Sequence, residues 1–172
     1  VKHINSISRI LPDRYVWLDR FTIRNLELLH STHETGIALV DVLDQTVSPM
    51  GARLLRKWVV LPLKTVSEIQ SRLGVVDWMV TNCETAESLR ALIRQAGDLE
   101  RLISRVPLGK VNPREVRQLE RSLSLIPQIR EVLSASGQPA LEQMADRLNP
   151  CDKLRDTISA RLVENPPVNL TK

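Results

Sequence analysis

His30 and His33 stand three residues apart beside Glu34, and this is the nearest approach to a metal-binding pattern in the chain. A zinc site needs further protein ligands of the same kinds, and none accompanies this pair at ligand spacing. The two histidines also precede a glycine in a predicted loop, where solvated imidazoles are the ordinary finding. The pattern therefore predicts loop histidines and no metal site.

The sequence contains no nucleotide-binding loop motif and no convincing set of catalytic residues. A phosphate loop requires two glycines at fixed spacing followed by Lys and Ser or Thr, and neither Gly51 nor Gly109 begins such a motif. Among the paired carboxylates, Asp98 is best explained as a helix cap, and Glu100 as a partner for nearby arginines. The sequence predicts a non-enzymatic segment with no catalytic, cofactor-binding or metal residues.

Three basic residues, Arg53, Arg56 and Lys57, are the candidate contacts to the DNA backbone. The formal net charge of +4 and the pI near 9.4 permit nucleic-acid binding. However, charged residues opposite an apolar stripe are usually the solvated face of a helix, and no aromatic residue is interleaved to stack on bases. An autonomous basic helical module that binds the duplex backbone is therefore the alternative function.

The composition favours a helical protein. Hydrophobic residues make up 42% of the 172 positions and aromatic residues only 3%, so Leu, Ile, Val and Ala must build the core. No apolar run is long enough to span a membrane, and no signal peptide is present. Two cysteines cannot form a disulfide framework, which predicts reduced thiols in a cytoplasmic protein. The start at Val1 and the end at Lys172 suggest a fragment of a longer chain.

Capping signals predict most of the elements that would position these residues. Ser48 and Pro49 open an amphipathic helix that Pro62 closes, and a brief helical turn over 39–43 precedes it. Asn112, Pro113 and Glu115 open a long helix that should kink or break at Pro127. Further helices are predicted over 65–80 with a capping box from Thr65 to Glu68, over 83–96, over 99–106 after a break at Gly97 and Asp98, over 140–148 and over 151–163.

Apolar periodicity predicts the strand and the buried faces. Partial alternation predicts a short strand over Thr22–Leu28. Helical spacing predicts that the helix from Thr65 is buried along Ile69, Leu73, Val76 and Val80. The fold class predicted is all-α, a multi-helix bundle with a short N-terminal strand segment.

Four segments together resemble one family. They read LDRFTIRNLELL from Leu18, VLDQTVSPMGARLLRKWVVLPL from Val42, GDLERLISRV from Gly97 and NPREVRQLERSLSLIPQIREVL from Asn112. In this order and with these gaps they resemble the core, or lever, domain of the bacterial DNA mismatch-repair family MutS. The resemblance implies that residues 1–17 are the end of a connector and that 18–172 are the first segment of the core. The clamp and the helices returning from it are then lacking.

The resemblance also implies a function and partners for the parent protein. Such a parent binds mismatched duplex DNA as a homodimer, hydrolyses ATP with Mg and recruits other repair proteins, with no membrane involved. The mismatch-reading Phe-x-Glu motif and the ATPase lie outside this segment. The core would therefore link the mismatch-binding, clamp and ATPase parts without catalysis of its own.

Truncation gives a last expectation. Apolar side chains that meet missing helices should be exposed, either along Val116, Leu119, Leu123 and Ile126 or on the helix over 151–163. Such an exposed apolar surface would favour self-association of the fragment.

Overall fold

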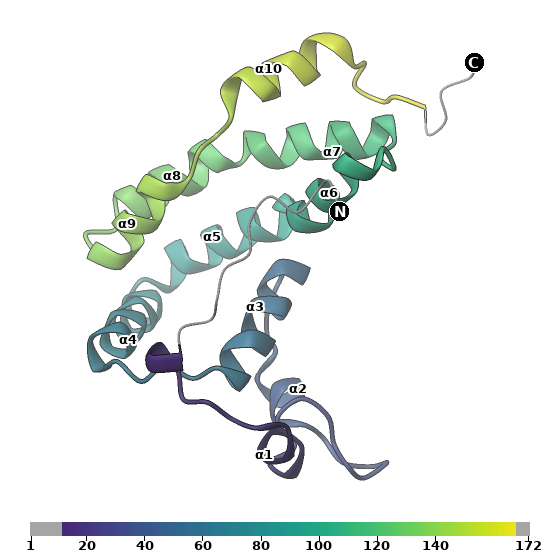
Figure 1. Cartoon of the computed structure of the whole chain (residues 1–172). Helices are drawn as coiled ribbons and strands as arrows, with labels where there is room; N and C mark the ends of the chain where they lie inside the picture. The colour runs from purple at the N-terminus through teal and green to yellow at the C-terminus, as the bar shows by residue number, and fades with distance from the viewer. Residues whose placement is uncertain (1–11, 168–172) are drawn as a thin grey trace. The chain divides into compact units, whose positions relative to one another are not determined.

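The computed structural model describes residues 12–167, in which helices joined by turns and loops are the main elements, so the predicted all-α class is confirmed (Figure 1). The chain divides into two compact units, residues 1–73 and 74–172. The helices are α1 (Arg20–Asn25), α2 (Leu39–Leu43), α3 (Pro49–Val60), α4 (Val66–Thr81), α5 (Cys83–Ala96), α6 (Leu99–Arg105), α7 (Pro113–Ser124), α8 (Ile126–Ser134), α9 (Pro139–Arg147) and α10 (Asp152–Arg161), with short 3-10 turns at Pro12–Arg14 and Val106–Leu108.

The strand predicted over Thr22–Leu28 is wrong, because this segment forms α1 and the turn that follows it. Asp19 caps the helix, since its carboxylate accepts a hydrogen bond from the backbone N–H of Thr22 at 2.7 Å. Glu27 then takes a left-handed conformation with φ of 48°, which ends the helical path. The apolar residues that alternate in this segment therefore lie on α1 and on the turn that follows it.

The capping signals at Ser48 and Asn112 are confirmed. Ser48 accepts a hydrogen bond from the N–H of Gly51 at 3.1 Å. Asn112 accepts from the N–H of Glu115 at 3.0 Å, and the Glu115 carboxylate accepts from the N–H of Asn112 at 2.9 Å. This reciprocal pair is a complete capping box, so α7 begins where its sequence predicts.

The predicted break near Pro127 is also confirmed. α7 ends at Ser124 and α8 begins at Ile126, with Pro127 in the first turn of α8. Proline fits there because the N–H it lacks would have no partner within the helix.

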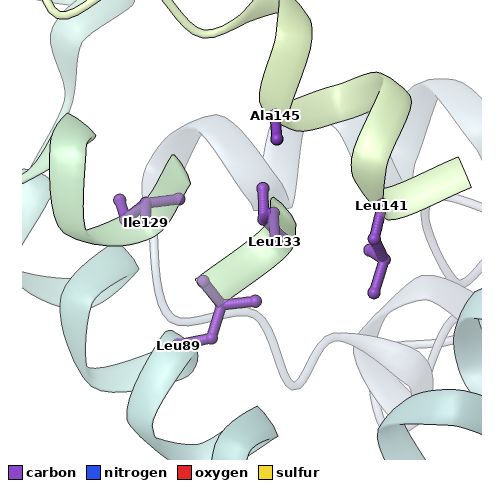
Figure 2. Close-up of a cluster of buried hydrophobic side chains, with 5 residues drawn as sticks. All are labelled: Leu89, Ile129, Leu133, Leu141 and Ala145. Atoms are coloured by element: carbon purple, nitrogen blue, oxygen red, sulfur yellow. The ribbon is translucent and has the colours of Figure 1, made fainter. Parts of the chain in front are cut away.

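The second unit is organised around one apolar cluster from three helices. Leu89 of α5, Ile129 and Leu133 of α8, and Leu141 and Ala145 of α9 gather in it, as Figure 2 shows. Leu141 is 1% exposed and Ala145 fully buried. α8 and α9 pack closely against each other, and α10 packs along α7.

The predicted buried face of α4 is wrong. Ile69, Leu73, Val76 and Val80 are exposed by 37%, 60%, 56% and 73%. In the second unit the residues that pack toward the core are instead Val75, Trp78 and Met79. α4 is apolar on more than one side, so periodicity alone did not identify the packed side.

The exposed apolar surface predicted from truncation does not lie on α7. Leu123 is buried, and Val116, Leu119 and Ile126 are partly buried. α10 exposes Leu154 by 47%, and Val163 just after it is 68% exposed, whereas Ile158 is buried. The predicted self-association stays a prediction, as does the boundary between residues 17 and 18.

The burial of Leu141 in this cluster predicts how its truncation changes the stability of the domain. We expect Leu141→Ala to lower the free energy of unfolding by about 2–5 kcal/mol, because the truncation leaves a cavity among α5, α8 and α9. Met144→Ala on the same helix is the matched control, since Met144 is 49% exposed and its truncation should cost less than about 1 kcal/mol. Chemical denaturation followed by circular dichroism measures both, and equal losses would contradict the assigned core.

Candidate functional site

The three candidate DNA-backbone residues lie together on α3. Arg53, Arg56 and Lys57 are all exposed on this helix. The structure thus brings the predicted residues onto one short stretch of surface. Whether they contact DNA stays a prediction.

The positive charge of α3 is partly compensated within the first unit. The guanidinium of Arg56 lies 3.8 Å from the carboxylate of Asp41, and these side chains are 43% and 53% exposed. A pair this exposed contributes about 0–1 kcal/mol. The pair with Asp41 gives Arg56 a role within the first unit that needs no DNA.

The apolar residues of α3 divide into two kinds. Leu55 and Val59 are partly buried, whereas Leu54 and Trp58 are exposed by 46% and 41%. The guanidinium of Arg72 lies over the Trp58 ring, 3.8 Å from its centroid. This cation–π contact joins α3 to the first part of α4.

The chain preceding α1 is held to the segment between α3 and α4. Tyr15 and Leu63 form an isolated antiparallel bridge, in which the N–H of Val16 donates to Pro62 O at 2.8 Å and the N–H of Lys64 donates to Arg14 O at 3.1 Å. This bridge fixes the path of residues 14–16 within the first unit.

An ion pair reinforces the bridge. The guanidinium of Arg14 lies 2.6 Å from the carboxylate of Glu68, and this hydrogen bond raises the pKa of Arg14. Glu68 therefore has a long-range partner in Arg14, and the capping box predicted with Thr65 stays a prediction.

Two arginines of α7 hold the segment that follows α10. Arg114 Nε donates to Pro166 O at 3.0 Å, and an Arg121 guanidinium N–H donates to Glu164 O at 3.2 Å. Pro166 is buried beneath this contact. Figure 1 shows α10 running beside α7, and the two arginines extend that association beyond the end of α10.

Other charged groups near α7 act in the same structural way. Arg105 pairs with Glu115 and also donates to Lys110 O at 2.7 Å, which fixes the loop from α6 to α7. Arg117 and Glu120 pair at 3.4 Å with side chains only 13% and 15% exposed. The charges in this region position backbone and helices.

Sequence reasoning did not identify Arg114 and Arg121. Their carbonyl partners lie 52 and 43 residues away, beyond any local pattern. One signal was available, because neither arginine has an acidic residue three or four positions away on α7. An arginine without such a partner is free to bond elsewhere.

The described residues offer neither a cluster of metal ligands nor a membrane-spanning helix. Across residues 12–167, no group of three or more His, Cys, Asp or Glu side chains is placed to hold a metal ion. No helix in that range combines the length and apolarity that a bilayer crossing requires.

Comparisons with known proteins agree with this structural picture. The family model described as MutS domain III matches residues 21–172. The DNA mismatch repair protein MutS of Christiangramia forsetii is 49% identical over 168 residues, which cover 98% of this chain and 19% of that protein. Those of Parabacteroides distasonis and Flavobacterium johnsoniae are each 46% identical over 172 residues, covering the whole chain and 20% of each relative.

The fold and its contacts define an all-helical domain in which side-chain chemistry serves to position chain segments. The chain belongs to the MutS family and corresponds to its domain III. It spans about a fifth of the length of the curated relatives it matches.

The contacts of Arg114 and Arg121 make a local prediction. We expect R114A/R121A to increase amide hydrogen exchange at Leu162, whose N–H donates to Ile158 O, because the end of α10 frays more readily once two hydrogen bonds worth about 1 kcal/mol each are lost. The helical circular dichroism signal should be unchanged. Arg130→Ala, at an exposed position on α8, is the control and should leave this N–H protected. Unchanged protection in the double variant would contradict the role given to the two arginines.

Proposed function

We propose that this chain is the core, or lever, domain of a DNA mismatch-recognition ATPase, and that it links the mismatch-binding, clamp and ATPase parts without catalysis of its own. The observation that carries the proposal is the match to MutS domain III over residues 21–172. The relatives named DNA mismatch repair protein MutS supply the process in which it would act.

The internal contacts support a mechanical role. A linking domain must transmit a displacement between distant sites, and packed helices with fixed ends do so with little loss. In the second unit, α7 begins with a complete capping box and holds the segment after α10 through Arg114 and Arg121. In the first unit, Arg14 and Glu68 hold the chain preceding α1. The segments flanking the helices are thereby fixed at both ends of the described region.

The proposal extends to the whole protein. Its parent would bind mismatched duplex DNA as a homodimer, use ATP and Mg in a separate domain, and recruit other repair proteins in the cytoplasm. Each of these properties belongs to the parent, and the segment described here would contribute rigidity and connection.

A graft tests the proposal directly. Residues 21–172 of this chain replace the matched segment of a MutS relative, and the chimera is expressed in a bacterial strain lacking its own MutS. We expect the spontaneous mutation rate to fall toward that of the repair-proficient strain. The same chimera carrying Leu141→Asp is the control, because a carboxylate in the cluster of Figure 2 should unfold the domain. A well-expressed, folded chimera that leaves the mutation rate high would refute the proposal.

The exposed cations of α3 are consistent with a second function. In it, the chain is an autonomous module that binds the duplex backbone through Arg53, Arg56 and Lys57. Three phosphate contacts would make the logarithm of the binding constant fall with the logarithm of salt with a slope of about −2.7. Under the lever proposal we expect the isolated chain to bind duplex weakly, and the triple alanine variant to bind equally. A steep salt dependence that the triple variant abolishes would favour the DNA-binding module.

A further inference from the structure

The first unit contains an open pocket of about 790 Å³ beside α1 that the contacts above leave unused. Phe21, Ile23 and Leu29 form its apolar wall, and Arg20, Arg24 and His30 lie around it. All of these residues fall within 20–32, so the pocket depends only on α1 and the loop that follows it.

The apolar wall is partly open to solvent, since Ile23 and Leu29 are half-buried and Phe21 is exposed. Phe21 is the only phenylalanine of the chain and is 77% exposed. Aromatic and arginine side chains together are typical of the energetically important part of protein interfaces. The wall is therefore suited to receive an apolar side chain.

The local carboxylates do not compensate the arginines around the pocket. The Asp19 carboxylate caps α1 through the N–H of Thr22. The Glu27 carboxylate accepts hydrogen bonds from Thr32, including its N–H at 2.7 Å. No carboxylate of residues 12–167 forms an ion pair with Arg20 or Arg24. The pocket thus combines an apolar wall with exposed positive charge.

We propose that this pocket binds an acidic segment of the longer mismatch-repair protein of which this chain would be a part. This inference rests on the proposed function. One aliphatic or aromatic side chain of that segment packs against Phe21 and Leu29, and flanking carboxylates pair with Arg20 and Arg24. Carboxylates match the planar donors of arginine in a bidentate manner.

Two features favour an acidic peptide of the same polypeptide over single-stranded nucleic acid. A single strand is held by successive aromatic platforms, whereas this pocket has one aromatic ring beside two aliphatic residues. The relatives are about five times as long as this chain, so most of the surface available within such a protein belongs to other domains.

Site-specific photo-crosslinking tests the docking in the full-length protein. Phe21→p-benzoylphenylalanine is irradiated, and the linked peptide is identified by mass spectrometry. We expect one major product, joining position 21 to a peptide of the same polypeptide with an apolar residue flanked by Asp or Glu. The matched control places the probe at Leu26, which is 60% exposed and does not line the pocket. It should not give that product.

A charge-reversal arm tests the role of the arginines. R20E/R24E should lower the yield of the product at position 21 severalfold. R94E/R130E reverses two exposed arginines of the second unit and should leave the yield unchanged. A product with DNA, with another protein or with a segment lacking acidic residues would overturn the inference, as would a yield insensitive to R20E/R24E.

The mutation rate of the same strains separates this inference from the proposed function. Probe variants that restore repair are folded, so repair without the acidic product refutes the docking alone. A high mutation rate with the unsubstituted full-length protein refutes the proposed function itself.

Discussion

The short helices of the second unit depend on one shared apolar cluster. α9 has only nine residues and α8 also nine, lengths at which an isolated helix is unstable in water. Leu141 and Ala145 become buried only because Leu89, Ile129 and Leu133 approach from α5 and α8. The turn between α8 and α9 is fixed by the same packing, since the indole N–H of Trp78 donates to Ser136 O at 2.9 Å. Helix formation and tertiary packing are therefore one event here.

Once that cluster is in place, the arginines of the unit can act over long sequence distances. Arg114 and Arg121 can reach the carbonyls of Pro166 and Glu164 only when α10 already lies along α7. Arg105 and Glu115 likewise require α6 and the start of α7 to be packed. Charged groups committed in this way are not available as acids, bases or ligands, which agrees with a positioning role.

The sequence predicted those features whose cause is local. Ser48 and Asn112 bond N–H groups three residues away, so their capping could be read directly from spacing. Glu68 also pairs with Arg14, which is far away in sequence, and no local spacing predicted this ion pair. Phe21 is a strand former, yet the Asp19 cap and the turn at Glu27 made its segment a helix. The contacts of Arg114 and Arg121 depend on packing between residues that are far apart in sequence, and no local spacing in a single sequence indicates them.

The two units differ in how completely they cover their apolar residues, and this difference bears on function. The second unit buries a continuous cluster, whereas the first leaves Trp17, Phe21 and Ile37 exposed by 67%, 77% and 70%. Scattered apolar residues on a surface are ordinary, but several large ones on a unit this small are typical of a surface that meets another protein part. A domain that links others needs both properties: a rigid interior that keeps its shape, and an apolar exterior where neighbours attach. Under the proposed linking role, the second unit would supply the interior, and the exposed residues of the first would supply the attachment.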